Sequence, residues 1–198
     1  MSALWPYATP GIPDKLFAQL PGIPLTKRDV RMLVMGYLRL KPDAHLWDIG
    51  AGTGTVTIEA ALLCPNGQVT AVERDEEVAG LIQKNCDRFE VSNVNVISGS
   101  APECLERIKG EPSCILIEGA PLHITLEAAW EKLALNGRIV VTATNLEALY
   151  TVSDTFAKLH TRNIEVAQPA VNRLETRGNR QVFTSVDPIF IISGDKLE

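Results

Sequence analysis

The sequence predicts an α/β fold in which a mainly parallel sheet is covered by helices on both faces. Strand and helix signals alternate almost without a break from residue 26 to residue 192. Residues 114–117 form the continuous apolar run that is typical of a central parallel strand. The 198 residues, 45% of them hydrophobic, suit one domain with a sizeable core. We expect residues 1–198 to form that single domain, with residues 1–27 as an N-terminal arm and residues 28–198 as the core.

The chain begins with residues 5–24, which are rich in proline and glycine and are expected to be ordered but irregular. Thr26 and Asp29 then have the arrangement of a capping box, in which the threonine hydroxyl caps a helix and the carboxylate reaches back. Apolar residues from Val30 to Leu38 fall at helical spacing, and Pro42 ends this helix before the first strand.

The apolar periodicity of the remaining sequence predicts the other elements. Helices are expected from residue 55, over residues 75–89 and 101–108, up to residues 130–133, and over residues 146–159. Strands are expected from residue 46 to the first glycine of a turn and over residues 68–72, 94–98, 114–117 and 138–142, with residues 164–167, 182–185 and 189–192 as closing strands.

The most informative feature is a glycine turn between the first strand and the helix that follows it. The turn consists of Gly50, Ala51, Gly52, Thr53 and Gly54. Glycines let the backbone turn sharply and approach a ligand closely, and the following helix presents unpaired N–H groups. The next strand ends in Glu73, whose carboxylate can accept hydrogen bonds from both hydroxyls of a ribose. Together they predict a nucleoside site; a purely structural turn is the alternative.

The spacing of the turn favours S-adenosylmethionine over NAD. A dinucleotide fingerprint requires G-x-G-x-x-G, whose last glycine packs the helix beside a pyrophosphate. Thr55 and Thr57 stand where this glycine would fall, and the acidic Asp48 precedes the turn. S-adenosylmethionine has no phosphate, so the turn has to hold an adenosine and a charged amino-acid tail.

Ligands of such sheets bind beyond the carboxyl ends of the strands, where the strand order reverses. This rule brings the glycine turn, Glu73 and the turns at residues 99–101 and 118–120 around one pocket. The predicted fold is therefore that of a class I S-adenosylmethionine-dependent methyltransferase. This is a Rossmann-like domain with a mainly parallel seven-stranded sheet and an antiparallel closing strand.

Composition argues against several other classes of protein. No apolar stretch approaches the length of a membrane span, and the N-terminus lacks a basic region followed by a hydrophobic one. A net charge of −5 argues against general affinity for nucleic acid. The four cysteines form no C-x-x-C pair, and the three histidines have no metal-ligand spacing. We expect free thiols, no bound metal, no membrane or nucleic-acid partner, and a cytoplasmic location.

Several segments resemble one known family, the decarboxylating precorrin methyltransferases of cobalamin biosynthesis. They match the start of these enzymes, their glycine loop, their third-strand turn, and their fifth and last strands. The matching segments are residues 11–14, 23–31, 46–61, 99–103, 137–141 and 187–192. The resemblance spans nearly the whole chain, and the N-terminal segment with the Ala-Pro-Glu turn is its most selective part.

This resemblance implies methylation of precorrin-6B or cobalt-precorrin-6B at carbon 15, coupled to decarboxylation of the acetate at carbon 12. The enzyme would mainly align S-adenosylmethionine with the tetrapyrrole and exclude water, while the macrocycle takes up the electrons. No residue is identified as an essential acid or base. Relatives assemble as tetramers, and some carry a fused second methyltransferase for carbon 5. We therefore expect a homo-oligomer and a separate carbon-5 enzyme.

The family pattern also implies roles for individual residues. The glycine turn would hold the methionine and adenosine portions of the cofactor, Glu73 the ribose, and Ala101 the adenine. Thr26 would contact the cofactor, cap its helix, or do both. Ser100 replaces an Asp of many methyltransferases, so the adenine amino group lacks its usual side-chain partner. Glu118 replaces a glycine, either as a solvent-facing strand terminus or as a substrate contact.

A precorrin carries several carboxylates, so its pocket should contain cations, preferably arginines with their bidentate fork. Charges in an arginine-rich loop are more often simply solvated. Asn145, just past the fifth strand, faces the same edge of the sheet and is a candidate for orienting the substrate. The candidate cations are Lys27 and Arg28 at the arm, and Arg173, Arg177 and Arg180 at an expected C-terminal hairpin.

Two other functions stay open on sequence grounds. One is methyl transfer to a different acceptor, such as a tRNA base or a protein carboxylate, although the acidic net charge disfavours tRNA. The other is a non-catalytic nucleoside-binding module, against which the intact glycine turn and Glu73 argue. Failure to bind S-adenosylmethionine would favour this module.

Overall fold

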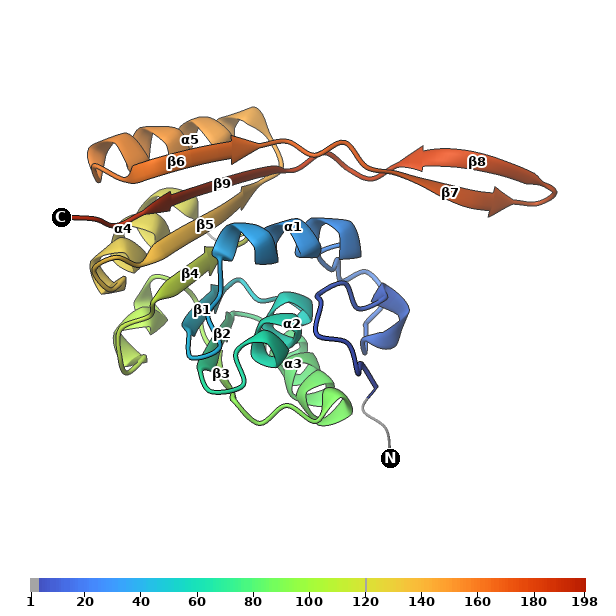
Figure 1. Ribbon diagram of the computed structural model, residues 1–198, viewed down its shortest axis with the longest axis horizontal. Coiled ribbons are helices and arrows are strands. Elements are labelled where there is room, and N and C mark those ends of the chain that lie inside the picture. Colours follow the sequence, from blue (N-terminus) through green and yellow to red (C-terminus); the bar gives the residue numbers. More distant parts are fainter. Residues whose placement is uncertain (1–3, 120) are drawn as a thin grey trace.

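The computed structural model describes residues 4–119 and 121–198, and a seven-stranded sheet forms its centre (Figure 1). The strands lie in the order β3-β2-β1-β4-β5-β9-β6. Their bounds are His45–Ile49 (β1), Gln68–Glu73 (β2), Val94–Ser98 (β3), Cys114–Ile117 (β4), Arg138–Ala143 (β5), Arg162–Ala167 (β6) and Phe190–Asp195 (β9). β1 to β5 are parallel, whereas β9 runs antiparallel to both of its neighbours. The predicted mainly parallel sheet with an antiparallel closing strand is confirmed.

Helices cover both faces of this sheet (Figure 1). One face carries α1 (Arg28–Leu38), α2 (Thr55–Leu63) and α3 (Glu76–Phe89), and the other carries α4 (Leu122–Lys132) and α5 (Leu146–Lys158). The helix predicted over residues 101–108 is a short 3-10 turn, Glu103–Arg107, and a second such turn covers Asp14–Leu16. Within the described residues, no helix is long and apolar enough to cross a membrane.

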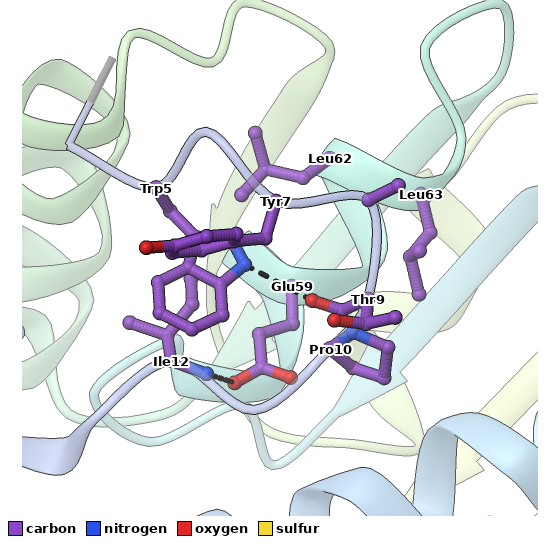
Figure 2. Close-up of a pocket in the computed structure, with 9 residues that line it drawn as sticks. Trp5, Tyr7, Thr9, Pro10, Ile12, Glu59, Leu62 and Leu63 are labelled. Atoms are coloured by element: carbon purple, nitrogen blue, oxygen red, sulfur yellow. Dashed lines mark hydrogen bonds between the residues drawn. The ribbon is translucent and has the colours of Figure 1, made fainter. Parts of the chain in front are cut away.

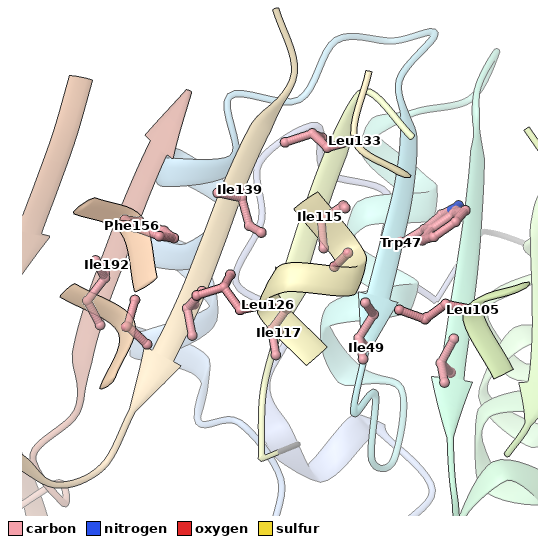
Figure 3. Close-up of a cluster of buried hydrophobic side chains, with 14 of the residues drawn as sticks. Trp47, Ile49, Leu105, Ile115, Ile117, Leu126, Leu133, Ile139, Phe156 and Ile192 are labelled. Carbon is pink, nitrogen blue, oxygen red and sulfur yellow. The ribbon is translucent and has the colours of Figure 1, made fainter. Parts of the chain in front are cut away.

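The alternation of side chains along the strands divides the core into two parts. Trp47, Ile115 and Ile139 belong to one cluster with Leu126 of α4 and Phe156 of α5 (Figure 3). Their sequence neighbours pack on the opposite face with α1 and α2. These neighbours are Leu46, Leu116 and Val140. Because the central strands are buried on both faces, their sequences are mostly apolar, with Asp48 on β1 as a buried exception.

A two-stranded antiparallel ribbon, β7 (Asn172–Arg177) and β8 (Arg180–Ser185), lies between β6 and β9 in the sequence and projects away from the sheet (Figure 1). Residues 182–185 form a strand and residues 173–180 lie in a hairpin, as predicted, but this strand does not close the main sheet. These residues pair with β7, and β6 and β9 alone close the sheet. Alternating apolar and polar residues indicate a strand but do not specify its partner.

Buried charges tie the N-terminal arm to α1 and α2. Glu59 accepts hydrogen bonds from the backbone N–H groups of Gly11 and Ile12, each at 2.9 Å. Figure 2 shows the bond from Ile12. The fully buried guanidinium of Arg31 pairs with Glu59 at 3.0 Å and with Asp14 at 2.8 Å. The arm is irregular, as predicted, and is held by these polar contacts.

The capping box predicted at Thr26 is wrong. α1 begins at Arg28, and Lys27 is its N-cap residue without a side-chain capping bond. The Arg28 N–H donates instead to the Asp14 carboxylate at 3.0 Å, and Asp29 accepts a hydrogen bond from the ribbon. Residues distant in the sequence therefore make the contacts that a local capping box would have made.

Arg31→Met tests the anchoring of the arm, because it removes the cation between two carboxylates and leaves Glu59 buried without its charged partner. We expect a loss of about 3–5 kcal/mol in the free energy of unfolding, measured by urea denaturation. The matched control is Lys132→Met, which removes an exposed pair with Glu106 and should cost less than about 1 kcal/mol. Equal losses in the two variants would contradict the anchoring role.

Candidate active site

The glycine turn lies at the carboxyl edge of the sheet and is fixed by its neighbours. The N–H groups of Gly50 and Ala51 donate to the Val72 carbonyl at 2.9 and 3.0 Å. A Cβ at Gly50, where φ is +82°, would lie 1.8 Å from the carbonyl oxygen of Glu118, so only glycine fits. At Gly52, where φ is +55°, a Cβ would meet no described atom within 4 Å. The backbone is therefore open to a ligand at Gly52.

Glu73 ends β2 with its carboxylate against this turn. One oxygen accepts from the Gly52 N–H at 2.9 Å, and the other accepts from the Asp75 N–H at 3.0 Å. Each oxygen has a second lone pair, so this fixed carboxylate can still accept hydrogen bonds from hydroxyl groups of a ligand. β3 ends beside it, where the Gly99 N–H donates to the Glu73 carbonyl at 2.9 Å, and Ala101 follows two residues later.

Asp48 is fully buried on β1, beneath the glycine turn. Its Oδ2 accepts from the Thr57 hydroxyl at 2.5 Å, whereas its Oδ1 has no hydrogen-bond partner in residues 4–119 and 121–198. Burial raises the pKa of Asp48 to about 7; the charges of Glu118 and Glu73 add to this effect, and the Thr57 bond opposes it. A carboxyl group that titrates near neutral pH thus lies under the turn.

Glu118 follows β4 and connects the arm to the sheet. Its N–H donates to the Ile49 carbonyl at 2.9 Å. Its two carboxylate oxygens accept from the hydroxyls of Thr26 and Thr142, each at 3.1 Å. Burial raises the pKa of Glu118, while the two hydroxyl donors and the charge of Arg31 lower it. The side chain is therefore engaged by the arm and by β5, which is not the arrangement of a freely solvated strand terminus.

The structure brings part of the predicted site together. Thr26, the glycine turn and Glu73 meet at the carboxyl edge, with the turn after β3 beside them. The predicted turn at residues 118–120 is described as far as Gly119, because Ala120 lies outside the described residues. Two hydroxyls that bind the acidic side chains, those of Thr57 and Thr142, are not among the site residues that the sequence predicts. Thr142 could have been found as the last residue of the predicted fifth strand.

The candidate substrate residues are more dispersed. Arg173 is close to the arm, with its guanidinium 2.5 Å from Asp29, and Lys27 and Arg28 begin α1 nearby. Asn145 is the N-cap of α5 and accepts a hydrogen bond from the Ala148 N–H at 2.8 Å. The remaining two candidates lie at the tip of the ribbon, which projects far from the glycine turn (Figure 1). These are Arg177 and Arg180.

A cavity of about 420 Å³ lies at the opposite, amino edge of the sheet. Its lining includes Arg39, Lys41, Ser113 and Arg138. The Arg138 guanidinium is already bound, in part by Asp195 at 2.6 Å. None of the predicted cofactor residues lines this cavity, and ligands of parallel sheets bind at the carboxyl edge instead.

The described residues contain neither a disulfide nor a cluster of side chains that could bind a metal ion. All four cysteines are free and buried, and burial raises the pKa values of the thiols, to about 11 for Cys64 and Cys86. Residues 4–119 and 121–198 contain no group of three or more His, Cys, Asp or Glu side chains arranged to hold a metal ion.

The side chains around the turn fit S-adenosylmethionine better than a phosphate ligand. Asp48, Glu73 and Glu118 are all acidic, so they would repel phosphate and attract a sulfonium or an ammonium group. The open backbone at Gly52 and the spare lone pairs of Glu73 suit an adenosine. A Rossmann-like seven-stranded sheet with such an edge defines a class I S-adenosylmethionine-dependent methyltransferase.

Comparison with known proteins gives the family. The chain belongs to the precorrin methyltransferases, because the model of the precorrin methyltransferase domain matches residues 19–196. The chain is thus an enzyme, with S-adenosylmethionine as its methyl donor. The predicted family, fold class and cofactor are confirmed, and the non-catalytic module is set aside.

Relatives with a named function match almost the entire chain. A probable cobalt-precorrin-6B C(15)-methyltransferase (decarboxylating) of Pyrobaculum calidifontis is 38% identical over 96% of this chain and 97% of that protein. The cobalt-precorrin-6B C(15)-methyltransferase (decarboxylating) of Salmonella typhimurium is 34% identical over 93% of this chain and 96% of that protein. The crystal structure of precorrin-6y C5,15-methyltransferase from Geobacter metallireducens superposes with a TM-score of 0.86, at 33% identity over 94% of this chain and 98% of that one.

Asp48→Asn tests the buried acid beneath the turn. A carboxyl whose pKa is raised by folding binds its proton more tightly in the folded state, so stability falls as the pH rises from its unfolded pKa of 3.8 to about 7. Between about pH 5 and pH 8, the wild type should lose roughly 2–3 kcal/mol more unfolding free energy than Asp48→Asn in urea titrations.

The control for this measurement is Asp154→Asn, which changes an exposed acid on α5 and should keep the pH dependence of the wild type. A parallel pH dependence of the wild type and Asp48→Asn would contradict the assignment of the raised pKa to Asp48.

Proposed function

We propose that this chain methylates carbon 15 of cobalt-precorrin-6B, or of metal-free precorrin-6B, and releases the carboxylate of the carbon-12 acetate as carbon dioxide. The observation that carries this proposal is the match, over almost the full length of both chains, to relatives named cobalt-precorrin-6B C(15)-methyltransferases (decarboxylating). Their names favour the cobalt-containing substrate. The open acidic edge of the sheet supplies a site of the required chemistry.

We place S-adenosylmethionine at the carboxyl edge, with its ribose hydroxyls on the free lone pairs of Glu73. Its adenine lies against Ala101 at the end of β3, and Thr26 approaches from the arm. The methionine and adenosine portions follow the turn of Gly50, Ala51, Gly52, Thr53 and Gly54. The fixed Glu73 carboxylate and the open backbone at Gly52 support this placement.

S-adenosylmethionine supplies an electrophilic methyl group when it is bound. The residues at the edge then have a positioning task, because they align this methyl group with the tetrapyrrole carbon and exclude water. Loss of carbon dioxide leaves an electron pair that the conjugated macrocycle accepts. We therefore assign the chain a binding and orienting role, and no side chain is named as an acid or a base.

The anionic substrate is assigned to the side of the edge where the arm meets the ribbon. Lys27 and Arg28 lie there, and the Arg173 side chain is 37% exposed, so a substrate carboxylate can share its guanidinium with Asp29. The Asn145 amide keeps its NH₂ group for donation, because its oxygen caps α5. Arg177 and Arg180 would reach a substrate held by a neighbouring copy of the chain.

The ribbon supports assembly of several copies. Two-stranded ribbons are at best marginally stable in water, and here Phe183 is 74% and Leu174 53% exposed. We propose a homotetramer in which neighbouring chains cover these side chains. Each copy acts as one methyltransferase domain, residues 1–198, with the arm at residues 1–27. The free thiols fit a cytoplasmic location, and a separate enzyme methylates carbon 5.

Mass spectrometry of products tests the proposed reaction. The purified chain, given S-adenosylmethionine and cobalt-precorrin-6B or precorrin-6B, should yield a product that has gained one methyl group and lost one carbon dioxide. The cobalt form should react faster. Methylation without loss of carbon dioxide would contradict the decarboxylating role, and unchanged substrate despite bound S-adenosylmethionine would contradict the choice of acceptor.

Sedimentation equilibrium tests the proposed assembly, because four copies of the 21.6 kDa chain differ clearly in mass from one. The wild type should sediment as a tetramer, and Phe183→Asp should shift it to smaller species by placing a charge in the covered surface. Tyr150→Asp is the matched control, since Tyr150 on α5 is 73% exposed and lies outside the ribbon. A monomeric wild type would refute the assembly.

A further inference from the structure

The Glu118 carboxylate is held by neutral donors alone. Its hydrogen bonds come from the Thr26 and Thr142 hydroxyls, and no Lys, Arg or His of residues 4–119 and 121–198 forms an ion pair with it. The charge of Arg31 lowers the pKa of Glu118, but the Arg31 guanidinium forms its ion pairs with Glu59 and Asp14. A partly buried carboxylate in this position is stabilised by a cation in direct contact, and none of the described residues supplies one.

The order of the strands places Glu118 across the glycine turn from Glu73. β2 carries Glu73 on one side of β1, and β4 leads into Glu118 on the other side. In the proposed placement, with its adenine at the end of β3 and its ribose on Glu73, a nucleoside extends its 5′ substituent over the turn toward Glu118. In S-adenosylmethionine that substituent is the methionine tail, which ends in an ammonium and a carboxylate group.

A second observation also points to a cation at this place. Asp48 is fully buried under the same turn, and its Oδ1 has no hydrogen-bond partner in the described part of the chain. The charges of Glu118 and Glu73 both raise the pKa of Asp48, so each of these carboxylates lies close enough to repel a charge on Asp48. A positive group above the turn would relieve this repulsion, and a negative group would increase it.

We infer that Glu118 binds the α-ammonium group of the methionine tail of the methyl donor. Glu118 thereby completes the cofactor site that the glycine turn and Glu73 form in part. This inference rests on the proposed placement of S-adenosylmethionine. Each Glu118 oxygen keeps one lone pair after the threonine bonds, so the carboxylate can accept from the ammonium without releasing the arm. The bound tail then lies next to Thr26, and the arm forms part of the cofactor site.

The test is a thermodynamic cycle of two proteins and two ligands, in which calorimetry measures the affinity of each protein for each ligand. The ligands are S-adenosylhomocysteine and its deamino analogue, in which hydrogen replaces the amino group. The wild type should bind S-adenosylhomocysteine about 10- to 100-fold more tightly than the analogue, which is the range for a hydrogen bond between charged groups. Glu118→Gln should bind both ligands with affinities within about 3-fold of each other. Glu131→Gln, an exposed change on α4, should keep the wild-type preference.

The remaining outcomes overturn either the ammonium contact or the proposed cofactor site. A Glu118→Gln variant that binds both ligands more weakly by the same factor, or that keeps the wild-type preference, would overturn the ammonium contact. If this variant does not fold, a wild-type preference below about 2-fold overturns the contact by itself. A wild type that binds neither ligand would overturn the proposed cofactor site, which is a different failure.

Discussion

The contact between Gly50 and Glu118 fixes the carboxyl edge of the sheet. The Glu118 carbonyl occupies the space that a side chain at Gly50 would need, and the Val72 carbonyl binds the same turn from the other side. The turn is therefore held between the ends of β2 and β4. Because of this, Glu73 and Glu118 stand on opposite sides of an open stretch of backbone, with the buried Asp48 beneath it.

The arm belongs to this edge although it lies far from the edge in sequence. Arg31 holds the arm through Asp14 and Glu59, and Thr26, which precedes α1, reaches Glu118. Asp14 also pairs with Arg173 of the ribbon at 3.4 Å. These ion pairs and the Thr26 hydrogen bond thus connect the ribbon, the arm and the site. If the ribbon joins neighbouring chains as proposed, assembly also supports the arm in its position over the site.

The sequence predicts the features that local patterns determine. Strand and helix periods, the left-handed glycine turn and the acid at the end of β2 are encoded within short windows, so the sheet and one side of the site follow from them. Two predictions failed because a local pattern does not identify the partner of a hydroxyl or of a strand. Thr26 does not cap its helix, since its hydroxyl donates to Glu118, 92 residues away. Residues 182–185 have a strand pattern, but nothing within it distinguishes a ribbon from the main sheet.

Hydrogen exchange with and without S-adenosylhomocysteine tests most directly whether this edge is the cofactor site. The account predicts slower exchange in peptides that cover residues 50–57 and residues 23–28. Exchange should be unchanged in residues 39–44, which border the cavity at the amino edge. Slower exchange confined to residues 39–44, with no change at the glycine turn, would contradict the account.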